Sequence, residues 1–470
     1  MTIDINSNPA TLVLDLGKTN VKLLVINKTG HVIDDVRLDN QSLDAPPYPH
    51  LDTERVWRWL LETASGFAKK YSIDAIVPTT HGCAAALVGA GELVLPILDY
   101  EAEIPEDSVE AFRAVMPTFE ETQSPDLPGG LSLGRQLFWL QRDFPDEFAR
   151  AEWVLAYPQY WAWRLSGVAA SEVTSISCHS HLWRPQTRSF SKLVKEQGWY
   201  RLFPPIRPAC DALAPILTQV AQATGISPEC RIYNGIHDAN AAYSLFLRGY
   251  TEPFSLLSTG TWVVLINPNL PIARLNEHRD TMALADLNGR PVPMGRFMGG
   301  REFEILSADV GATKEFSEAD VRSVIAKRSY LLPSFAAGGP YMGHRGSEIG
   351  QQVTTSGEIL ARATLYLAMM TMTSAHILEM DGDLIITGGF VNNPWYCRLV
   401  ATLTRCRRCF VDHQSESTAL GAGMLPVWND DDIQWPLDLT PVEKFHDTDL
   451  FQYAEEWQQL TNLQAADGAN

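Results

Sequence analysis

Apolar and polar positions follow two different periods along the chain, and this predicts a mixed α/β protein. Near the N-terminus an apolar run at 12–14 ends at Asp15, and after a short polar turn a second run occupies 21–27. Short apolar runs rich in β-branched residues and bounded by turn residues are typical of buried strands. We therefore predict a β-hairpin here, which a third strand-like run, 31–38, extends.

The turn of this hairpin differs from the two common nucleotide-binding loops. The patterns G-x-x-x-x-G-K-[ST] and G-x-G-x-x-G both lead directly into a helix, whereas here the chain continues as a strand. The tip, Gly17, Lys18, Thr19 and Asn20, offers backbone N–H groups, an ammonium, a hydroxyl and an amide. Such donors suit a phosphate. An ordinary hairpin with a polar turn is the competing interpretation.

Charged side chains flank this tip. Asp15, at the end of the first strand, could hold a metal ion through its water shell. Lys18 and Lys22 are the positive charges at the predicted phosphate cradle. We expect at least one of them to contact the phosphates, because alternate strand positions point to opposite faces.

Polar residues also follow the next strand-like runs. A helix predicted within 51–71 begins at an Asp52 or Thr53 cap and leads into a buried run that ends at His81. A further strand-like stretch, 91–101, ends in Asp99, Tyr100 and Glu101. Polar groups at strand ends commonly face the crevice of an open α/β sheet. A structural role for His81 is the competing interpretation.

A candidate carboxylate lies in the middle of the chain. After a short predicted strand at 231–233, Gly235 opens a turn, and His237 and Asp238 precede a helix of small residues. The helix dipole favours a negative charge at this position. The sequence alone leaves open whether Asp238 is a functional group or an N-cap.

The opening pattern then recurs. Thr259, Gly260 and Thr261 form a small polar turn between two apolar runs, which suggests a duplicated core with one hairpin in each domain. Further on, Gly388 and Gly389 follow a predicted strand and allow the backbone to approach a flat ligand closely. A Thr355/Glu358 capping box predicts the start of a long helix.

Composition narrows the class of protein. With 470 residues, 45% of them hydrophobic and 20% charged, two or three globular domains are expected. A net charge of −19 disfavours nucleic-acid and anionic-membrane partners. The scattered seven cysteines fit reduced thiols in a cytoplasm, and Cys406 and Cys409 favour idle thiols over a zinc site. The start of the chain does not resemble a signal peptide, and no apolar run is long enough to span a membrane.

Taken in order over about residues 10–425, the motifs resemble the FGGY carbohydrate kinase family of the actin-like ATPase superfamily. "DLGKTN" and "STGTW" resemble the two phosphate hairpins, and "GIHDANAA" resembles the segment of the catalytic aspartate. "ITGGFVNNPWY" and "ESTALGAG" resemble the adenosine segment. In motif style the chain is most similar to rhamnulose and fuculose kinases.

The resemblance implies an α/β protein with two actin-like (RNase H-like) domains and an interdomain cleft. The expected ranges are 10–246 for a domain with the sugar site and first phosphate hairpin, 247–430 for a nucleotide-binding domain, and 431–470 for a surface segment. The expected reaction is ATP-dependent phosphorylation of a small sugar, such as a 6-deoxyketohexose or a pentulose. Magnesium is the expected metal, the location is cytoplasmic, and a homodimer is one expected assembly.

Site residues follow from the matching motifs. The resemblance makes Asp238 the catalytic base, with Asp15 and Asp238 holding the metal. The implied ATP-binding residues are Gly17, Lys18, Thr19, Asn20, Lys22, Gly260, Thr261, Gly388, Gly389, Asn392 and Asn393. The implied sugar-binding residues are His81, Asp99, Tyr100, Glu101, His237 and Asp238.

Two departures from the family pattern are visible. Lys18 stands where the family usually has a small hydroxyl residue, and the segment after Tyr341 lacks a clean signature for the rear of the nucleotide pocket. An actin-like ATPase that uses no sugar and a catalytically inactive sensor are the alternative functions. Neither the sugar nor the oligomeric state can be derived from the residues.

Overall fold

A computed structural model describes residues 9–308, 310, 315–404 and 406–467 of the chain and divides it into two compact units. Unit 1 comprises residues 1–250, 284–291 and 416–437, and unit 2 comprises residues 251–283, 292–415 and 438–470. Residues 1–8, on which the expectation about a signal peptide rests, lie outside the described part.

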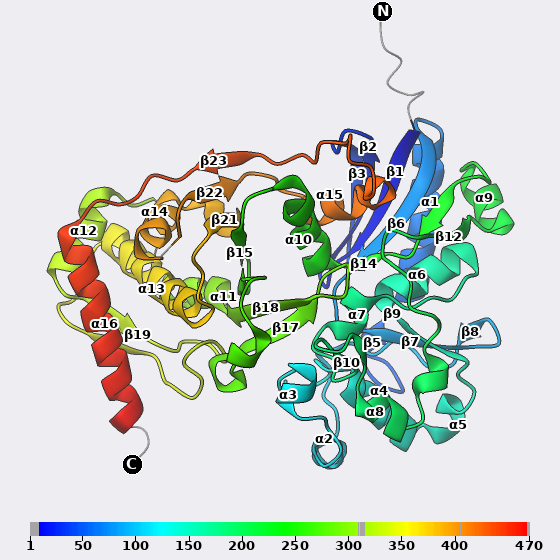
Figure 1. Ribbon diagram of the computed structural model, residues 1–470, viewed down its shortest axis with the longest axis horizontal. Helices are drawn as coiled ribbons and strands as arrows, with labels where there is room; N and C mark the ends of the chain where they lie inside the picture. Colours follow the sequence, from blue (N-terminus) through cyan, green and yellow to red (C-terminus); the bar gives the residue numbers. More distant parts are fainter. Residues whose placement is uncertain (1–8, 309, 311–314, 405, 468–470) are drawn as a thin grey trace, which may run out of the picture. The chain divides into compact units, whose positions relative to one another are not determined.

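The main sheet of unit 1 has the strand order β12-β13-β6-β1-β2-β3, with β14 also paired to β6. β1 pairs antiparallel with β2 and parallel with β6, and β2 pairs antiparallel with β3, so the predicted opening hairpin and its third strand are confirmed (Figure 1). The strands are β1 (Pro9–Leu16), β2 (Asn20–Asn27), β3 (Val32–Asp39), β6 (Ser72–Thr80), β12 (Ala212–Pro215), β13 (Arg231–Tyr233) and β14 (Ile236–His237).

Helices cover both faces of this sheet. Successive side chains of a strand point to opposite faces, so each central strand contributes to a core on either side. Leu12 and Leu14 of β1 pack in one core with α1 (Thr53–Ala68) and α6 (Tyr157–Ser166). Val13 packs in a second core with α10 (Asp238–Gly249) and α15 (Ser417–Gly423). A strand buried on both faces explains why the run 12–14 is continuously apolar.

A smaller layer of unit 1 surrounds a three-stranded sheet of order β8-β7-β9. Its elements are β7 (Ala85–Gly89), β8 (Glu92–Leu93), β9 (Trp153–Ala156), α2 (Glu106–Arg113), α4 (Leu133–Asp143), α5 (Pro145–Phe148) and α8 (Lys192–Glu196). The predicted strand over 91–101 was wrong beyond β8. The apolar pattern of this stretch reflects buried side chains, those of Leu95, Ile97 and Leu98, and not a strand. Pro96 has no backbone N–H and cannot donate a hydrogen bond to a neighbouring strand.

Unit 2 is built around a sheet of order β17-β18-β16-β15-β21-β22-β23. β15 pairs antiparallel with β16 and parallel with β21, as β1 does with β2 and β6, so the second predicted hairpin is confirmed in a separate unit. The strands are β15 (Phe254–Thr259), β16 (Val263–Ile266), β17 (Thr281–Ala285), β18 (Pro291–Phe297), β21 (Asp383–Gly388), β22 (Cys409–Asp412) and β23 (Leu439–Pro441).

One large core on this sheet contains the long helix α13 (Ser356–Ile377). Thr355 caps it as predicted, since its Oγ1 accepts a hydrogen bond from Glu358 N at 3.1 Å. The other half of the predicted capping box is displaced by one residue, because Glu358 Oε2 accepts from Thr354 N at 3.2 Å. Other helices of unit 2 are α11 (Gly299–Leu306), α12 (Glu318–Ala326) and α14 (Pro394–Leu403).

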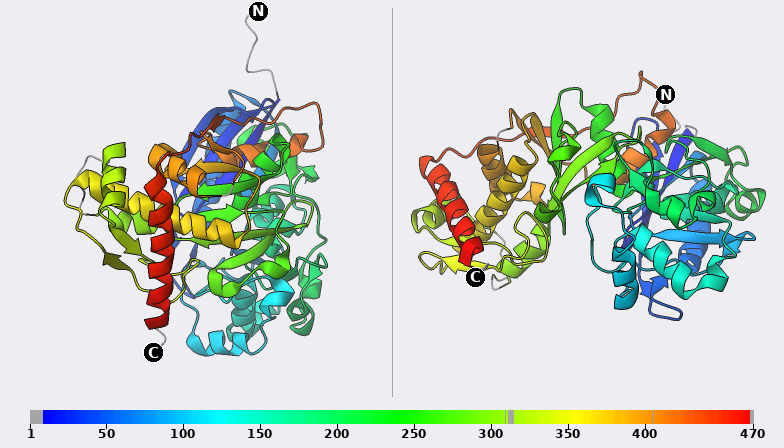
Figure 2. Two further views of the ribbon diagram at one scale, coloured as in Figure 1. Left: turned by 60° about the vertical axis from the view of Figure 1, so that its left-hand side comes forward. Right: turned by 60° about the horizontal axis from the view of Figure 1, so that its bottom comes forward.

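The expected surface segment 431–470 is divided differently by the structure. Residues up to 437 complete unit 1, and the end of the chain forms α16 (Thr448–Asp467), drawn red in Figure 2. Trp457 is fully buried, and its Nε1 donates to Leu331 O at 2.7 Å. The sequence-based boundaries missed this because the buried positions of α16 are spaced among many acidic and amide residues.

No helix among the described residues combines the length and the apolarity that crossing a membrane requires.

Candidate active site

Asp15 is the innermost charged group at the first hairpin. It lies opposite Lys22 in the β1–β2 register and is only 8% exposed. Burial raises the pKa of Asp15 to about 7, and the nearby charges of Asp238 and Glu416 add to the effect of burial, while Lys22 opposes it. The ammonium of Lys22 pairs with Glu416 Oε2 at 2.7 Å. The structure therefore brings two predicted site residues, Asp15 and Lys22, together with Glu416, which the sequence did not single out.

The tip of the hairpin is ordered by one hydrogen bond within the turn and by two from Asn40, which follows β3. Gly17 N donates to Asn20 O at 2.9 Å, and Asn40 N donates to Thr19 O at 2.8 Å. Asn40 also donates from Nδ2 to Gly17 O at 2.9 Å. Thr19 and Asn20 are exposed. The side chains of Thr19 and Asn20 therefore face solvent on a turn whose backbone is fixed by these hydrogen bonds.

Lys18 does not share this arrangement. Its ammonium makes a close ion pair with Asp99 and lies 3.2 Å from Glu101 Oε2. It also lies 4.9 Å from the centroid of the Tyr100 ring. Lys18 therefore contacts three of the predicted sugar-binding residues, although its motif had assigned it to the phosphates.

Asp99 is a buried carboxylate within this group. Burial alone would raise the pKa of Asp99, but hydrogen bonds from Lys18, Ser42 and Glu101 N outweigh it and lower that pKa. The Tyr100 ring meets the His81 ring edge-on, with centroids 5.2 Å apart. Asp99, Tyr100, Glu101 and His81 are thus close together, although only His81 directly follows a strand.

His81 presents one ring nitrogen without a partner. Its Nδ1 lies 2.8 Å from Gly82 O, which can only accept, so Nδ1 carries the proton. Nε2 is buried and has no hydrogen-bond partner among the described residues. Burial also lowers the pKa of His81. The ring is therefore neutral, with a buried acceptor available at Nε2.

His237 and Asp238 begin α10 in a defined geometry. His237 occupies the N-cap position and Asp238 is the first helical residue, so the N-cap interpretation of Asp238 was wrong by one position. Asp238 Oδ1 lies 3.1 Å from His237 Nε2 and accepts from Ala239 N at 2.6 Å. The Asp238 side chain is 34% exposed, so its carboxylate reaches solvent while its base is held by the helix start.

The sequence missed the residues that hold His237 in place. Asn240 donates to Ala285 O at 2.6 Å, so its Oδ1 accepts from His237 Nδ1 at 2.8 Å. Thr174 Oγ1 accepts from His237 N at 3.2 Å, and in turn donates to the fully buried Glu172 at 2.5 Å. The spacing His237-x-x-Asn240 was the one available signal, because the other contacts join distant segments.

The second hairpin is organised without charged side chains at its tip. Gly260 N donates to Trp262 O at 2.9 Å. Thr259 Oγ1 donates to Thr387 O at 2.6 Å and accepts from Phe390 N at 3.0 Å, which joins the hairpin to the turn after β21. Gly260 and Thr261 are exposed. Their backbone and the Thr261 hydroxyl are the groups this tip presents.

The glycine turn after β21 lies against this hairpin. Gly388 has φ +87°, and a Cβ there would lie 2.0 Å from Thr259 O, so only glycine fits. Gly389 and Asn392 are exposed. Asn393 caps α14 by accepting from Tyr396 N at 3.1 Å and donates to Thr364 Oγ1 at 3.1 Å. Of the two predicted asparagines, Asn393 is thus engaged within unit 2 while Asn392 faces solvent.

Two buried carboxylates of unit 2, also missed by the sequence, hold the loop that follows β19 (Tyr330–Leu332). Glu302 Oε1 accepts from Phe335 N at 2.9 Å and from Tyr366 Oη at 2.8 Å. Asp280 accepts from Gly339 N at 2.8 Å. This loop is therefore held by carboxylates that are distant from it in the sequence.

Magnesium is the metal that the sequence led us to expect. Among the described residues, no three His, Cys, Asp or Glu side chains gather closely enough to hold a metal by themselves. Asp15 and Asp238 are near enough for the charge of one to raise the pKa of the other. Two carboxylates fit magnesium, which keeps several water ligands and takes others from substrate phosphates.

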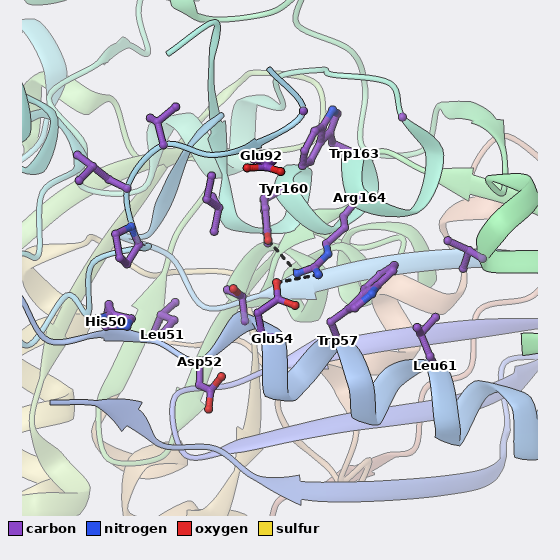
Figure 3. A pocket seen from close by; sticks show the side chains of 18 of the residues that line it. His50, Leu51, Asp52, Glu54, Trp57, Leu61, Glu92, Tyr160, Trp163 and Arg164 are labelled. Atoms are coloured by element: carbon purple, nitrogen blue, oxygen red, sulfur yellow. Dashed lines mark hydrogen bonds and ion pairs between the residues drawn. The ribbon is translucent and has the colours of Figure 1, made fainter. Parts of the chain in front are cut away.

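A groove of about 1110 Å³ in unit 1 lies apart from these residues (Figure 3). Arg164 crosses it, with its guanidinium 2.8 Å from Glu54 and 4.4 Å from the centroid of the Trp57 ring. None of the predicted site residues lines this groove. Arg164 and Glu54 thus pair with each other within the groove.

Comparisons with known proteins match both units. Residues 130–244 match the model described as "FGGY family of carbohydrate kinases, N-terminal domain", and residues 251–434 match "Carbohydrate kinase FGGY, C-terminal domain". A crystal structure of a carbohydrate kinase from Novosphingobium aromaticivorans has 35% sequence identity and a TM-score of 0.90, covering 97% of this chain and 99% of that chain.

More distant matches are also found. A xylulose kinase from Rhodospirillum rubrum has a TM-score of 0.81 at 16% identity, covering 97% of this chain and 98% of its own, and shows the fold alone. The L-fuculokinase of Salmonella typhi is 27% identical over 279 residues, which are 54% of this chain and 56% of that protein. The chain thus aligns with little more than half the length of this curated relative.

Proposed function

Because the chain belongs to the FGGY family of carbohydrate kinases, we propose that it transfers the γ-phosphate of ATP to a hydroxyl group of a small sugar. The observation that carries this proposal is the carboxylate of Asp238, held at the start of α10 beside His237 and near the buried Asp15. A half-exposed carboxylate in this position can accept the proton of a sugar hydroxyl as that oxygen attacks phosphorus.

The remaining residues bind and orient. The exposed Thr19 and Asn20 on the first hairpin, and Gly260 and Thr261 on the second, would donate hydrogen bonds to the phosphates. Gly388, Gly389, Asn392 and Asn393 would border the adenosine. When bound, magnesium would neutralise phosphate charge, and Asp15 with Asp238 would hold it. His81, Asp99, Tyr100, Glu101 and His237 would bind the sugar.

The narrower part of the proposal is a ketose substrate, either a 6-deoxyketohexose such as L-rhamnulose or L-fuculose, or a pentulose. The similarity to L-fuculokinase over about half of that protein supports the first class. We also propose a cytoplasmic location, where ATP is available; none of the seven cysteines, all of which lie in described parts of the chain, forms a disulfide.

A coupled assay of ADP formation tests the proposal, with L-fuculose, L-rhamnulose, xylulose and glycerol added singly to enzyme, ATP and magnesium. We expect ADP formation to require a sugar and to yield a phosphorylated product. Turnover of ATP that no sugar stimulates would indicate an ATPase. Binding of sugar and nucleotide without any product would indicate an inactive sensor. Either result would overturn the proposal.

A further inference from the structure

The ammonium of Lys18 is directed away from the hairpin tip that carries it. It pairs with Asp99 and, at 3.2 Å, with Glu101, and neither carboxylate belongs to the hairpin. The side chain is 22% exposed and the partner Asp99 is 9% exposed. One positive charge beside two negative charges leaves this group of residues with a net negative charge. A phosphate would therefore meet a poorly matched site at the Lys18 ammonium.

The same ammonium keeps one donor available. A lysine ammonium has three N–H donors. The structure shows two acceptors for Lys18, the carboxylate oxygens of Asp99 and Glu101. The third N–H has no carboxylate acceptor among the described residues, and the centroid of the Tyr100 ring is 4.9 Å from Nζ.

A complementary acceptor lies beside the same Tyr100 ring. The His81 ring centroid is 5.2 Å from that of Tyr100, and His81 Nε2 is buried without a partner among the described residues. The charge of Lys18 is also close enough to lower the pKa of His81. One unused donor and one unused acceptor therefore lie near a single aromatic ring. The hydroxyls of one sugar, each of which can accept and donate, match this pair.

We propose that Lys18 is a specificity-determining residue of the sugar site, which donates to one hydroxyl of the substrate while His81 Nε2 accepts from a hydroxyl of the same sugar. This inference rests on the proposed function and deepens it, because it names the substrate as an uncharged sugar. A sugar acid such as gluconate is disfavoured, since its carboxylate would face Asp99, Glu101 and Asp238.

The test compares Lys18→Met with Lys22→Met, the other lysine of the hairpin. We expect Lys18→Met to raise the KM for L-fuculose, and its calorimetric Kd without nucleotide, by about tenfold to a hundredfold, the range for losing a hydrogen bond to a charged group. The KM for ATP should stay within about twofold of the wild-type value, a change of less than about 0.5 kcal/mol. Lys22→Met should instead raise the KM for ATP and leave the KM and Kd for L-fuculose close to the wild-type values.

Other outcomes are decisive as well. An increase in the KM for ATP without weaker sugar binding would show that Lys18 acts on the phosphates of ATP, and it would overturn the inference. Efficient phosphorylation of gluconate by the wild-type enzyme would overturn it while leaving the kinase function intact, whereas absence of any sugar-dependent turnover would overturn both. If Lys18→Met does not fold, Lys18→Gln keeps an N–H donor without the charge. That variant should still weaken sugar binding because the charge is lost, and unchanged sugar binding would contradict the proposal.

Discussion

The β1–β2 hairpin of unit 1 and the β15–β16 hairpin of unit 2 share a backbone plan but differ in charge. In both, a glycine N–H closes the turn onto a carbonyl three or two residues ahead, Gly17 to Asn20 and Gly260 to Trp262. The first tip lies among Asp15, Lys18 and Lys22, each with charged neighbours, whereas residues 258–263 of the second carry no charged side chain. The two hairpins thus share one strand pairing, but the first lies among ionisable side chains and the second presents uncharged hydrogen-bond donors of its backbone and Thr261.

The largest test of this division is Asp238→Asn, which removes a charge from the unit that carries the ionisable groups. We expect kcat to fall by ~10²–10⁴-fold, because asparagine cannot accept the sugar proton. The fold should persist, since an asparagine Oδ1 can still accept from Ala239 N. Steady-state kinetics and sugar calorimetry check this, with near-normal sugar affinity as the control. Turnover close to that of the wild type would leave the proposed reaction without its base.

The second test disturbs the backbone of the turn that packs against the uncharged β15–β16 hairpin. Gly388→Ala places a Cβ 2.0 Å from Thr259 O at a positive φ. We expect the free energy of unfolding to fall by about 1–3 kcal/mol or more, with weaker ATP binding. Gly389→Ala is the matched control, because its Cβ would have no neighbour closer than 3.9 Å. Denaturant unfolding and nucleotide calorimetry measure the difference, and equal effects of the two substitutions would show that the turn tolerates side chains.

A smaller effect is expected from Lys22→Met in the charged copy. The substitution leaves Asp15 and Glu416 without their nearest cation, so the KM for ATP should rise by about tenfold, as when a charged hydrogen bond is lost. Lys70→Met is the control, because Lys70 pairs with Asp34 while 60% exposed, and such surface pairs contribute little. If both variants keep the wild-type KM for ATP, Lys22 does not contribute to phosphate binding.

The smallest predicted effect concerns pH. Burial lowers the pKa of His81 in the folded protein, so the unfolded chain takes up a proton near pH ~6.5 that the folded protein excludes. The stability contribution of His81 is therefore present above about pH 6.5 and lost as the pH falls. When the pH is lowered, the free energy of unfolding should decline less steeply for His81→Gln than for the wild type, as measured by denaturant unfolding at several pH values. Parallel declines would mean that His81 is not a buried neutral group.

The sequence predicted the elements that local patterns determine and missed what distant side chains determine. Both hairpins, α1, α10 and the cap of α13 follow from apolar runs and turn or cap residues that lie next to one another. The pairing of Lys18 with Asp99 joins residues 81 apart, and its motif pointed to a different ligand. Glu302 and Asp280 act on a loop that no local pattern connects to them.

Unit 1 also depends on a late part of the chain, which has a consequence for its biosynthesis. Its sheet is covered on one face by α10 and α15, and Ala419 and Leu420 of α15 pack in the same core as Val13 and Ile26. During synthesis the first strands therefore leave the ribosome about 400 residues before α15, long before this face can be fully covered. A fragment that ends before residue 416 would keep α10 but expose the part of that apolar face that α15 covers, so shortening the gene at the apparent domain boundary would yield an aggregating product rather than an isolated sugar-binding unit.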